Sequence, residues 1–338
     1  MVFVTGGTGL VGAHLLLELL SRGYEIRALK RKDSKFDQLK SIFTFYLGDK
    51  SEIEFNKINW VDGDLLDIIS LEEGITGCDK VFHCAAMISF VQRDFKRMMK
   101  INKHGTANIV NICLSAKVEQ LCYLSSTAAI GRNSLNESYT EENKWVNDAD
   151  NSNYAVSKYC AENEVWRGIE EGLNAVIINP SVILGPGDWN QSSLSIFKVV
   201  YKGLKFYTPG MNAVVDVRDV ATILCELSEQ KIENQRFLVI SENLFFKDLF
   251  EKIAENFKVK APSILVKPLM AEIAWRIVAI LHFCFRKKQN ITKETARSSM
   301  KISKYSNKKL KSKLNFEFIT ADDSIKNAVE YFSKNSTL

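Results

Sequence analysis

Several features that would assign a protein to a particular class are scarce or missing in this 338-residue sequence. Its seven cysteines form no CxxC pair, and its four histidines, at positions 14, 83, 104 and 282, are too scattered for a metal-binding pattern. We therefore expect reduced thiols in a cytoplasmic protein, and no metal site. Basic residues outnumber acidic ones by only 45 to 40, and no nucleic-acid-binding motif is present, so we expect no nucleic-acid partner.

Long apolar runs are missing as well. The chain opens on a strand-like stretch, Met1–Thr5, without the basic segment of a secretory signal. The most apolar segment, Leu269–Phe285, is shorter than the roughly 18–20 clean apolar residues of a membrane span, and it contains Glu272 and Arg276. We expect it to form a buried or lid helix without stable membrane insertion. The cations of Arg286–Lys288 behind it leave association with a membrane surface open.

The overall composition, 46% hydrophobic and 25% charged, is that of an ordinary folded protein. The length suits two domains or one large α/β unit. Up to about residue 180, short apolar segments alternate with helical ones, which is typical of a parallel sheet covered by helices. The predicted strands are Val2–Thr5, Glu25–Leu29, Ile58–Val61, Lys80–His83, Gln120–Leu124 and Ala175–Asn179. The predicted helices are Gly12–Arg22, Gln38–Tyr46, Phe95–Ala116 and Tyr154–Glu171.

Beyond Pro180 the alternation loosens, and we expect a region 181–338 that packs directly on region 1–180, with some of its strands returning to the first sheet. The elements predicted there are a turn at Leu184–Gly187, helices at Ser193–Tyr201, Phe246–Asn256 and Ile325–Phe332, and strands at Ala213–Val217 and Phe237–Ile240. No linker rich in glycine or proline separates the two regions.

The first strong functional signal is the glycine pattern TGGTGLVG at residues 5–12. It stands between an apolar strand and an amphipathic helix. Gly6 permits a tight turn, Gly9 lets the backbone approach a pyrophosphate, and Gly12 allows the helix to pack closely on the strand. The helix N-terminus adds free N–H groups and a partial positive charge. The pattern therefore predicts a dinucleotide-binding turn.

The end of the second strand carries cations, Lys30–Lys32, where dinucleotide-binding folds usually have an acid for the ribose hydroxyls. The first acid is Asp33. A guanidinium binds phosphate through two parallel hydrogen bonds, so Arg31 favours NADP(H), with NAD(H) as the alternative. A run of solvated charges that binds no ligand would give the same sequence pattern. Residues expected along the ribose and adenine, after the third and fourth strands, are Asp64, Leu65 and Ala85.

The second strong signal is the pair Tyr154 and Lys158, which lie four residues apart and so share one face of a helix. A phenol with a pKa of about 10 exchanges protons poorly at neutral pH, but a neighbouring ammonium lowers that pKa. The lysine can also hold the nicotinamide ribose. Upstream, residues 125–127 (SST) follow the fifth strand and offer hydroxyls to a substrate oxygen. Together these residues predict proton exchange with an alcohol or ketone.

These motifs resemble those of the extended short-chain dehydrogenase/reductase family (NAD-dependent epimerases and dehydratases), in its dihydroflavonol-reductase-like and 3-beta-hydroxysteroid-dehydrogenase-like branch. The stretches NPSVILGPGD (179–188) and VVDVRDVA (214–221) match later motifs of that family, so the resemblance covers nearly the whole chain. It implies an α/β fold, a Rossmann doubly wound parallel sheet with a smaller C-terminal substrate-binding region. It also implies a homodimer, paired through helices 95–116 and 154–171.

The resemblance assigns roles to single residues. Tyr154 would be the catalytic acid/base, Lys158 its partner and Ser126 the group that orients the substrate oxygen, with Ser125 and Thr127 as alternatives. Asn102 matches an active-site asparagine of the family. The residues implied for cofactor binding are Gly6, Thr8, Gly9, Leu10, Val11, Arg31, Asp64, Leu65, Ala85, Lys158, Pro180 and Val182.

The expected activity is the interconversion of a ketone and a secondary alcohol of a small-molecule substrate by an NAD(P)(H)-dependent oxidoreductase, NADP(H) being preferred. Ala128 and Ala129 stand where the sugar-nucleotide 4,6-dehydratases carry an Asp-Glu pair, which excludes dehydration. One alternative is an NAD-dependent sugar-nucleotide epimerase, which uses the same Tyr/Lys pair. A second is a dinucleotide-sensing protein without turnover, against which that pair argues. Residues 185–290 contain no motif that identifies the substrate.

Overall fold

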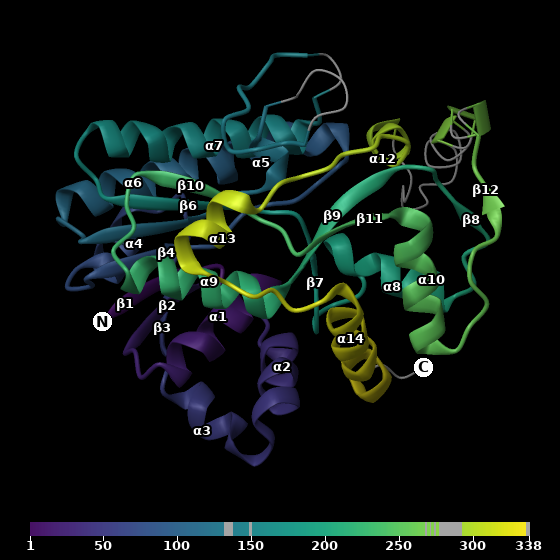
Figure 1. Ribbon diagram of the computed structural model, residues 1–338. Helices are drawn as coiled ribbons and strands as arrows, with labels where there is room; N and C mark the ends of the chain where they lie inside the picture. The colour runs from purple at the N-terminus through teal and green to yellow at the C-terminus, as the bar shows by residue number, and fades with distance from the viewer. Residues whose placement is uncertain are drawn as a thin grey trace.

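Seven parallel strands form the central sheet in the part of the chain that this computed structural model describes, residues 1–131, 138–148, 151–267, 269–270, 272–273, 275–276 and 293–335 (Figure 1). Their order is β3-β2-β1-β4-β5-β6-β10. The strands are β1 (Val2–Thr5), β2 (Ile26–Lys30), β3 (Asn59–Asp62), β4 (Lys80–His83), β5 (Gln120–Leu124), β6 (Ala175–Pro180) and β10 (Gln235–Val239). The order reverses beside β1, which creates a crevice at the carboxyl ends of the strands.

Helices cover both faces of this sheet, as Figure 1 shows. The first face packs against α1 (Leu10–Ser21) and α9 (Val217–Glu229), and the second against α4 (Ile68–Ile75), α6 (Gly105–Ser115) and α7 (Asn153–Glu170). Because both faces are covered, the central strands present apolar side chains to both sides: Val4 packs toward the first face and Phe3 toward the second. At the β3 edge lie α2 (Asp37–Leu47) and α3 (Ser51–Asn56).

Most of the remaining elements form a smaller layer beside the carboxyl ends of the strands. A three-stranded sheet has the order β11-β9-β7, and a separate parallel pair consists of β12 and β8. These strands are β7 (Val182–Leu184), β8 (Phe206–Tyr207), β9 (Met211–Asp216), β11 (Glu242–Phe245) and β12 (Ile264–Leu265). The helices of this layer are α8 (Ser195–Tyr201), α10 (Phe246–Phe257), α12 (Lys293–Ser298) and α14 (Ala321–Asn335). Two short helices lie against the central domain instead: α5 (Phe95–Met99) contacts α7, and α13 (Lys308–Leu314) contacts β10.

Most predicted elements are present, with shifted ends. The first helix begins at Leu10 instead of Gly12 because Gly9 is its N-cap. The predicted helix 95–116 is confirmed as one continuous helical stretch, within which the π-helical segment Lys100–His104 joins α5 to α6. The predicted strand 237–240 begins earlier, as β10. Of the predicted helix Leu269–Phe285, residues 277–285 lie outside the described residues, and the described positions before them are helical.

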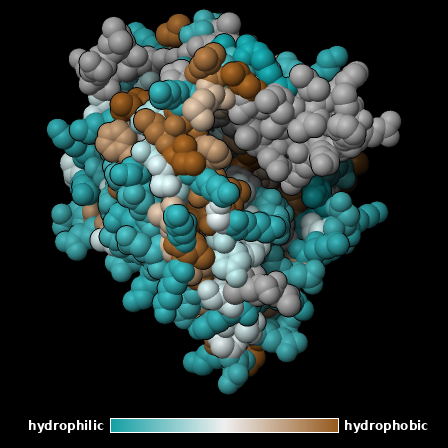
Figure 2. Space-filling model, turned by 90° about the vertical axis from the view of Figure 1, so that its right-hand side faces the viewer, coloured by the Kyte–Doolittle hydropathy of each residue, from teal (hydrophilic) through white to brown (hydrophobic). Residues whose placement is uncertain are grey.

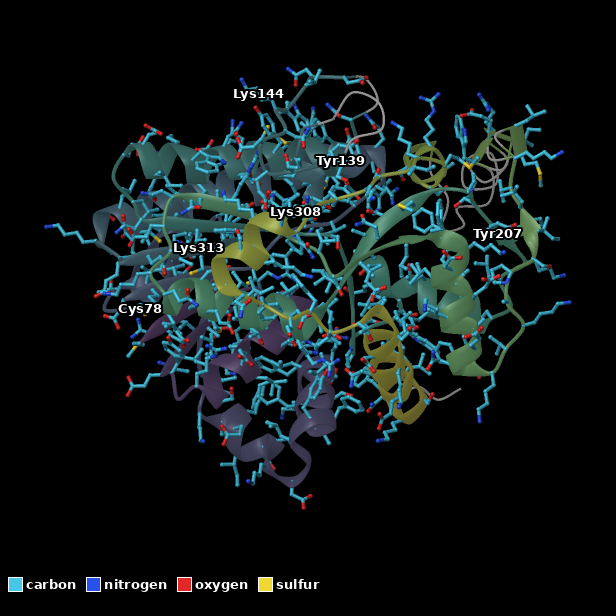
Figure 3. The ribbon with its side chains drawn as sticks, viewed as in Figure 1. Cys78, Tyr139, Lys144, Tyr207, Lys308 and Lys313 are labelled. Carbon is cyan, nitrogen blue, oxygen red and sulfur yellow. The ribbon has the colours of Figure 1, made fainter. Side chains whose placement is uncertain are left out.

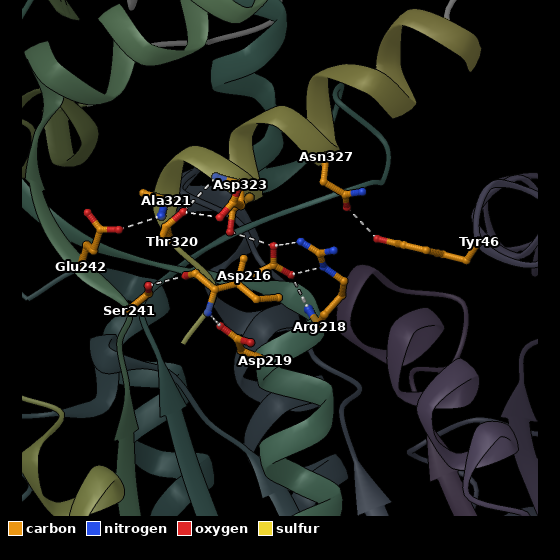
Figure 4. Close-up of polar contacts among 12 residues, drawn as sticks. Tyr46, Asp216, Arg218, Asp219, Ser241, Glu242, Thr320, Ala321, Asp323 and Asn327 are labelled. Carbon is orange, nitrogen blue, oxygen red and sulfur yellow. Dashed lines mark hydrogen bonds and ion pairs between the residues drawn. The ribbon is translucent and has the colours of Figure 1, made fainter. Parts of the chain in front are cut away.

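A buried polar junction holds α14 on the rest of the protein (Figure 4). Asp216 caps α9, accepting from the Arg218 backbone N–H at 2.7 Å and from the Arg218 guanidinium at 2.8–2.9 Å. The Ser324 hydroxyl of α14 donates to the same carboxylate at 2.7 Å. Nearby, Asp219 accepts from the backbone N–H of Ile319 at 2.9 Å. The wholly buried Asp216 carboxylate thus links the start of α9 to α14.

Stability should depend on pH through Asp219. Burial raises the pKa of Asp219 from 3.8 to about 7, so the folded protein keeps a proton that the unfolded chain loses near pH 4. The free energy of unfolding should therefore fall between about pH 4 and pH 7, by roughly 1.4 kcal/mol per pH unit at most. Asp219→Asn keeps an acceptor for the Ile319 N–H but cannot ionise. Urea unfolding should show it close to the wild type at about pH 4 and more stable at about pH 8.

Asp322→Asn is the matched control, since Asp322 is an exposed carboxylate paired with Lys252. Its difference from the wild type should stay within about 1 kcal/mol. A pH-independent difference between Asp219→Asn and the wild type would contradict this account.

Candidate active site

The turn between β1 and α1 is packed so tightly that side chains do not fit. Gly6 has a φ of +74°, and a Cβ there would lie 2.6 Å from the backbone nitrogen of Ala85. A Cβ on Gly12 would lie 2.0 Å from the carbonyl oxygen of Gly6. Gly9 caps α1 without any side-chain hydrogen bond, and the first turn of α1 holds no acid. The unused N–H groups and the close backbone form a cradle that fits a pyrophosphate.

The other residues predicted in this turn differ in exposure. Thr8 and Leu10 are half-buried beside the exposed Gly9, whereas Val11 is buried against the core. Thr8 and Leu10 therefore present backbone and side chain to a ligand, while Val11 contributes packing beneath it.

At the end of β2, the structure separates the three cations. Lys30 is paired with the Asp62 carboxylate of β3. The Arg31 guanidinium lies 3.4 Å from Asp33, and both side chains are largely exposed, so solvent weakens that pair. Lys32 is exposed. Arg31 and Lys32 are therefore both accessible to a ligand, and of the two only the guanidinium of Arg31 can bind a phosphate through two parallel hydrogen bonds.

The residues after β3 and β4 line the same edge. Asp64 is exposed, and its carboxylate accepts from the Leu66 N–H at 2.9 Å. Leu65 is buried behind it, with its carbonyl held by Asn108 at 2.9 Å. The Ala85 N–H donates to the Thr5 hydroxyl at 3.3 Å, which ties the loop after β4 to the glycine turn.

Tyr154 lies in the first turn of α7, which Ser152 caps by accepting from the Ala155 N–H at 2.9 Å. The ring of Tyr154 meets the edge of Phe90 at 5.9 Å. Burial raises the pKa of Tyr154 to about 12, against the lowering effect of the Ser126 side chain. The phenol is therefore protonated at neutral pH.

The three adjacent hydroxyl residues after β5 have separate partners. Ser125 donates to Glu162 at 2.5 Å in the interior. Burial raises the pKa of Tyr305 to about 12, and the Thr127 side chain acts against that rise. Ser126 caps a short 3-10 turn by accepting from the Ala128 N–H at 3.1 Å, and it also contacts Tyr154. The geometry thus distinguishes Ser126 from its two neighbours.

Lys158 lies one turn after Tyr154 and is almost completely buried. Its ammonium donates to the Tyr123 hydroxyl at 3.0 Å and to the Leu124 carbonyl at 2.8 Å. Burial lowers the pKa of Lys158 to about 8, while the Glu162 carboxylate acts to raise it. The expected lowering of the Tyr154 pKa by Lys158 is not what the structure shows, because burial of the phenol dominates and the ammonium is bonded elsewhere.

Behind Lys158 lies a carboxylate that the sequence analysis missed. Glu162 accepts from Ser125 and from Asn179, the latter at 2.7 Å, through one oxygen. Its other oxygen accepts from Arg236 at 3.1 Å and from Trp166 at 3.3 Å. The signal was available, since Glu162 follows Lys158 by four positions and so shares its helix face. Its partners on β6 and β10 could not be read from local spacing.

A second group of buried polar side chains lies between Lys158 and the glycine turn. The Thr106 hydroxyl lies 3.0 Å from Nε2 of His83. Nδ1 of His83 lies 2.6 Å from the hydroxyl of Thr5. Burial, assisted by the charge of Lys158, lowers the pKa of His83 to about 3, so the imidazole is neutral. The contacts of His83 tie the end of β4 to both Thr106 on α6 and Thr5 at the glycine turn.

Asn102 lies in the π-helical segment and has a structural task. Its amide donates to the Met87 carbonyl at 2.9 Å and to the Ser157 hydroxyl at 3.0 Å, and its oxygen accepts from the Met87 N–H at 2.7 Å. Both amide hydrogens are thus used. Asn102 fixes the loop after β4 against α7, and π-helical insertions are frequent at functional sites.

Pro180 ends β6 and is buried, and Val182 begins β7 and is half-buried. The predicted residues therefore all lie beyond the carboxyl ends of β1 to β6 or at the starts of α1 and α7. Ligands of open α/β sheets bind in this crevice.

Comparison with known proteins agrees with this geometry. Residues 2–239 match the sequence profile of the NAD dependent epimerase/dehydratase family. A putative dihydroflavonol 4-reductase from Synechocystis is 36% identical over 228 residues, 65% of this chain and 60% of that protein. Cinnamoyl-CoA reductase 1 from Petunia hybrida is 32% identical over 269 residues, 76% of this chain and 77% of that protein.

Among solved structures, that of gox2253 covers 100% of this chain and 99% of its own, with a TM-score of 0.82 and 29% identity. In the part of the chain that is described, no helix has the length and apolar character needed to cross a membrane. The matches confirm the predicted fold class, the predicted enzyme class and a nicotinamide dinucleotide cofactor. The chain belongs to the NAD dependent epimerase/dehydratase family, and it is an extended short-chain dehydrogenase/reductase acting on alcohol or carbonyl groups.

Proposed function

We propose that this protein is an NADP(H)-dependent oxidoreductase that interconverts a ketone and a secondary alcohol of a small or medium-sized substrate. The observation that carries the proposal is the placement of Tyr154 close to Ser126 and one helical turn before Lys158, at the strand edge that holds the glycine turn. Two hydroxyl groups then meet where a carbonyl oxygen can accept from both.

Tyr154 serves as the acid in reduction, because a phenol with a pKa of about 12 holds its proton at neutral pH and can give it to the developing alkoxide. Ser126 donates a hydrogen bond to the same oxygen. Lys158 turns from Tyr123 toward the ribose hydroxyls, which places its charge near the phenol. The bound nicotinamide supplies the hydride to the carbonyl carbon, so that hydride and proton together convert the ketone to the alcohol.

The cofactor-binding residues divide along the crevice by position. The α1 N-terminus and its turn, formed by Gly6, Thr8, Gly9, Leu10 and Val11, would hold the pyrophosphate. The adenosine end would be bound by Arg31, Asp64, Leu65 and Ala85. The nicotinamide end would be bound by Lys158, Pro180 and Val182.

Region 1–180 holds all of these cofactor contacts except Val182, and region 181–338 mainly binds the substrate, with β10 completing the central sheet. A homodimer paired through α5, α6 and α7 stays a prediction. Among the described residues, none of the large apolar side chains left exposed lies on these helices, so apolar surface does not support that contact. Polar side chains join α6 to α7, as in the 2.8 Å hydrogen bond from Arg167 to Asn111.

The test is a panel of ketones and sugar nucleotides incubated with the purified protein and NADPH, followed by the nicotinamide absorbance. Ketone-dependent oxidation of NADPH is expected. Epimerisation of a sugar nucleotide without net consumption of NADPH would contradict the proposal and favour the epimerase alternative.

The preference for NADP(H) should depend on Arg31. A 2′-phosphate beside its guanidinium gains charge-assisted hydrogen bonds of roughly 1.5–3 kcal/mol each, which solvent exposure reduces. The wild type should therefore bind NADPH about tenfold more tightly than NADH. Arg31→Asp should weaken NADPH binding and spare or improve NADH binding in calorimetric titrations, and rising salt should reduce the wild-type preference.

Lys35→Asp makes the same change of charge at an exposed position four residues further along the chain, and it should alter the preference little. Equal or tighter binding of NADH by the wild type would exclude the assignment of Arg31.

A further inference from the structure

Six large apolar side chains are exposed together at the outer side of the C-terminal region, on the β8–β12 pair and the helical residues that follow it. We call them the apolar edge: Phe206, Ile264, Leu265, Leu269, Met270 and Ile273, each between 40% and 71% exposed. Figure 2 faces this side and shows apolar atoms gathered there, and Figure 3 labels Tyr207 on β8 beside it. Single exposed apolar residues are normal, but a contiguous group marks an interaction site.

The fold itself does not require this group. The parallel pair sets Ile264 opposite Phe206, and it joins neither the central sheet nor the three-stranded sheet. It is held by backbone bonds from Ile264 to Lys205 at 3.0 Å and from Val266 to Tyr207 at 2.8 Å. A two-stranded pair of this kind is marginal without further burial. Its apolar side chains therefore contribute nothing to the core of the described structure.

The chain segments that carry the apolar edge are rich in cations. The exposed basic residues in and beside its segments are Lys202, Lys205, Lys258, Lys260, Lys267 and Arg276. Between positions 258 and 276 the sequence holds one acid, Glu272, which is bonded to Arg276 at 2.6 Å and lies 3.5 Å from Arg297. The guanidinium of Arg276 also lies 4.6 Å from the ring of Trp275. The rim is therefore positive, with an aromatic ring of the kind that favours membrane–water interfaces.

We propose that the apolar edge docks on the surface of a membrane that contains anionic lipid. An apolar centre with a cationic rim matches acyl chains bordered by negative headgroups. A second copy of this chain fits less well, because a two-fold contact would bring the two positive rims together. Docking is peripheral and reversible, consistent with the finding that no described helix can span a bilayer.

The experiment is vesicle flotation of the full-length protein, with phosphatidylcholine vesicles that contain or lack phosphatidylserine. The wild type should float with the anionic vesicles, and less so as salt rises. Leu265→Glu/Leu269→Glu should lower partitioning at least about tenfold. Lys205→Glu/Lys267→Glu should lower it to a similar degree on anionic vesicles only.

Ile68→Glu/Ile69→Glu is the matched control, since these residues are comparably exposed on α4, away from the apolar edge. It should float like the wild type. All variants change exposed side chains, so their melting temperatures should agree with that of the wild type. If Leu265→Glu/Leu269→Glu, the leucine variant, melts at a lower temperature, then Lys205→Glu/Lys267→Glu, the charge variant, tests the proposal.

Three results would overturn the proposal. The wild type fails to float with anionic vesicles, or the leucine variant floats as well as the α4 control. Alternatively, light scattering without lipid shows an assembly of the wild type that the leucine variant dissolves, in which case the edge is a contact between copies of the chain.

Discussion

Tyr154→Phe should lower kcat by about 10²–10⁴-fold on a verified ketone substrate, the usual contribution of a positioned acid or base. Only the exchangeable hydroxyl is lost, and the ring stays packed against Phe90. The dissociation constant for NADPH should therefore change little.

Lys158→Ala should lower both turnover and cofactor binding, because we place its ammonium on the ribose and near the phenol. Stopped-flow kinetics and calorimetry separate the two effects.

Tyr159→Phe is the matched control on the same helix. Its ring is stacked on Trp145 at 4.3 Å, outside the proposed chemistry, so turnover should be retained. If Tyr154→Phe keeps a tenth of the wild-type rate or more, Tyr154 is not the acid.

Glu162→Ala should be the most destabilising substitution proposed for this chain. It removes the carboxylate that accepts from Ser125, Asn179, Trp166 and Arg236 in the interior. Breaking a buried ion pair by removing one partner costs about 3–5 kcal/mol, because the other charge stays buried without compensation. Urea denaturation should show a loss of that size in the free energy of unfolding.

The same variant should affect the site. Since the Glu162 carboxylate raises the pKa of Lys158, its removal should move that pKa below about 8. As the pH rises, the variant should then lose its ammonium charge, and with it cofactor binding, at a lower pH than the wild type. Glu164→Ala is the control: Glu164 pairs with Arg167 on the outer side of α7, and its loss should cost within about 1 kcal/mol. Equal losses in the two variants would contradict the role given to Glu162.

The sequence predicted the parts of this protein that are locally encoded. The glycine turn is one, since the steric limits at Gly6 and Gly12 arise within one loop and its neighbour. The Tyr154–Lys158 pair is another, since four-residue spacing alone places both on one helix face. The helix α9 was missed although its signals are local: Asp216 caps it, and it buries Val217, Val220 and Leu224.

Other features depend on contacts between distant segments and could not be read from spacing. The π-helical turn Lys100–His104 is invisible in the apolar pattern of residues 95–116, and so are the contacts of its Asn102 with Met87 and Ser157. The pKa of Tyr154 was expected to fall beside an ammonium, yet burial raises it. Burial is a property of the assembled fold, so the direction of that shift required the structure.

The late position of β10 in the chain has a consequence for biosynthesis. β6 is buried along its whole length, and it pairs with β5 on one side and with β10 on the other. A ribosome releases β6 well before Val239, so the nascent chain carries an apolar strand with one unpaired edge, which can pair with other chains. Chaperones should therefore hold the growing chain until β10 has emerged, and a translation product that stops near Pro180 would keep that aggregation-prone edge permanently.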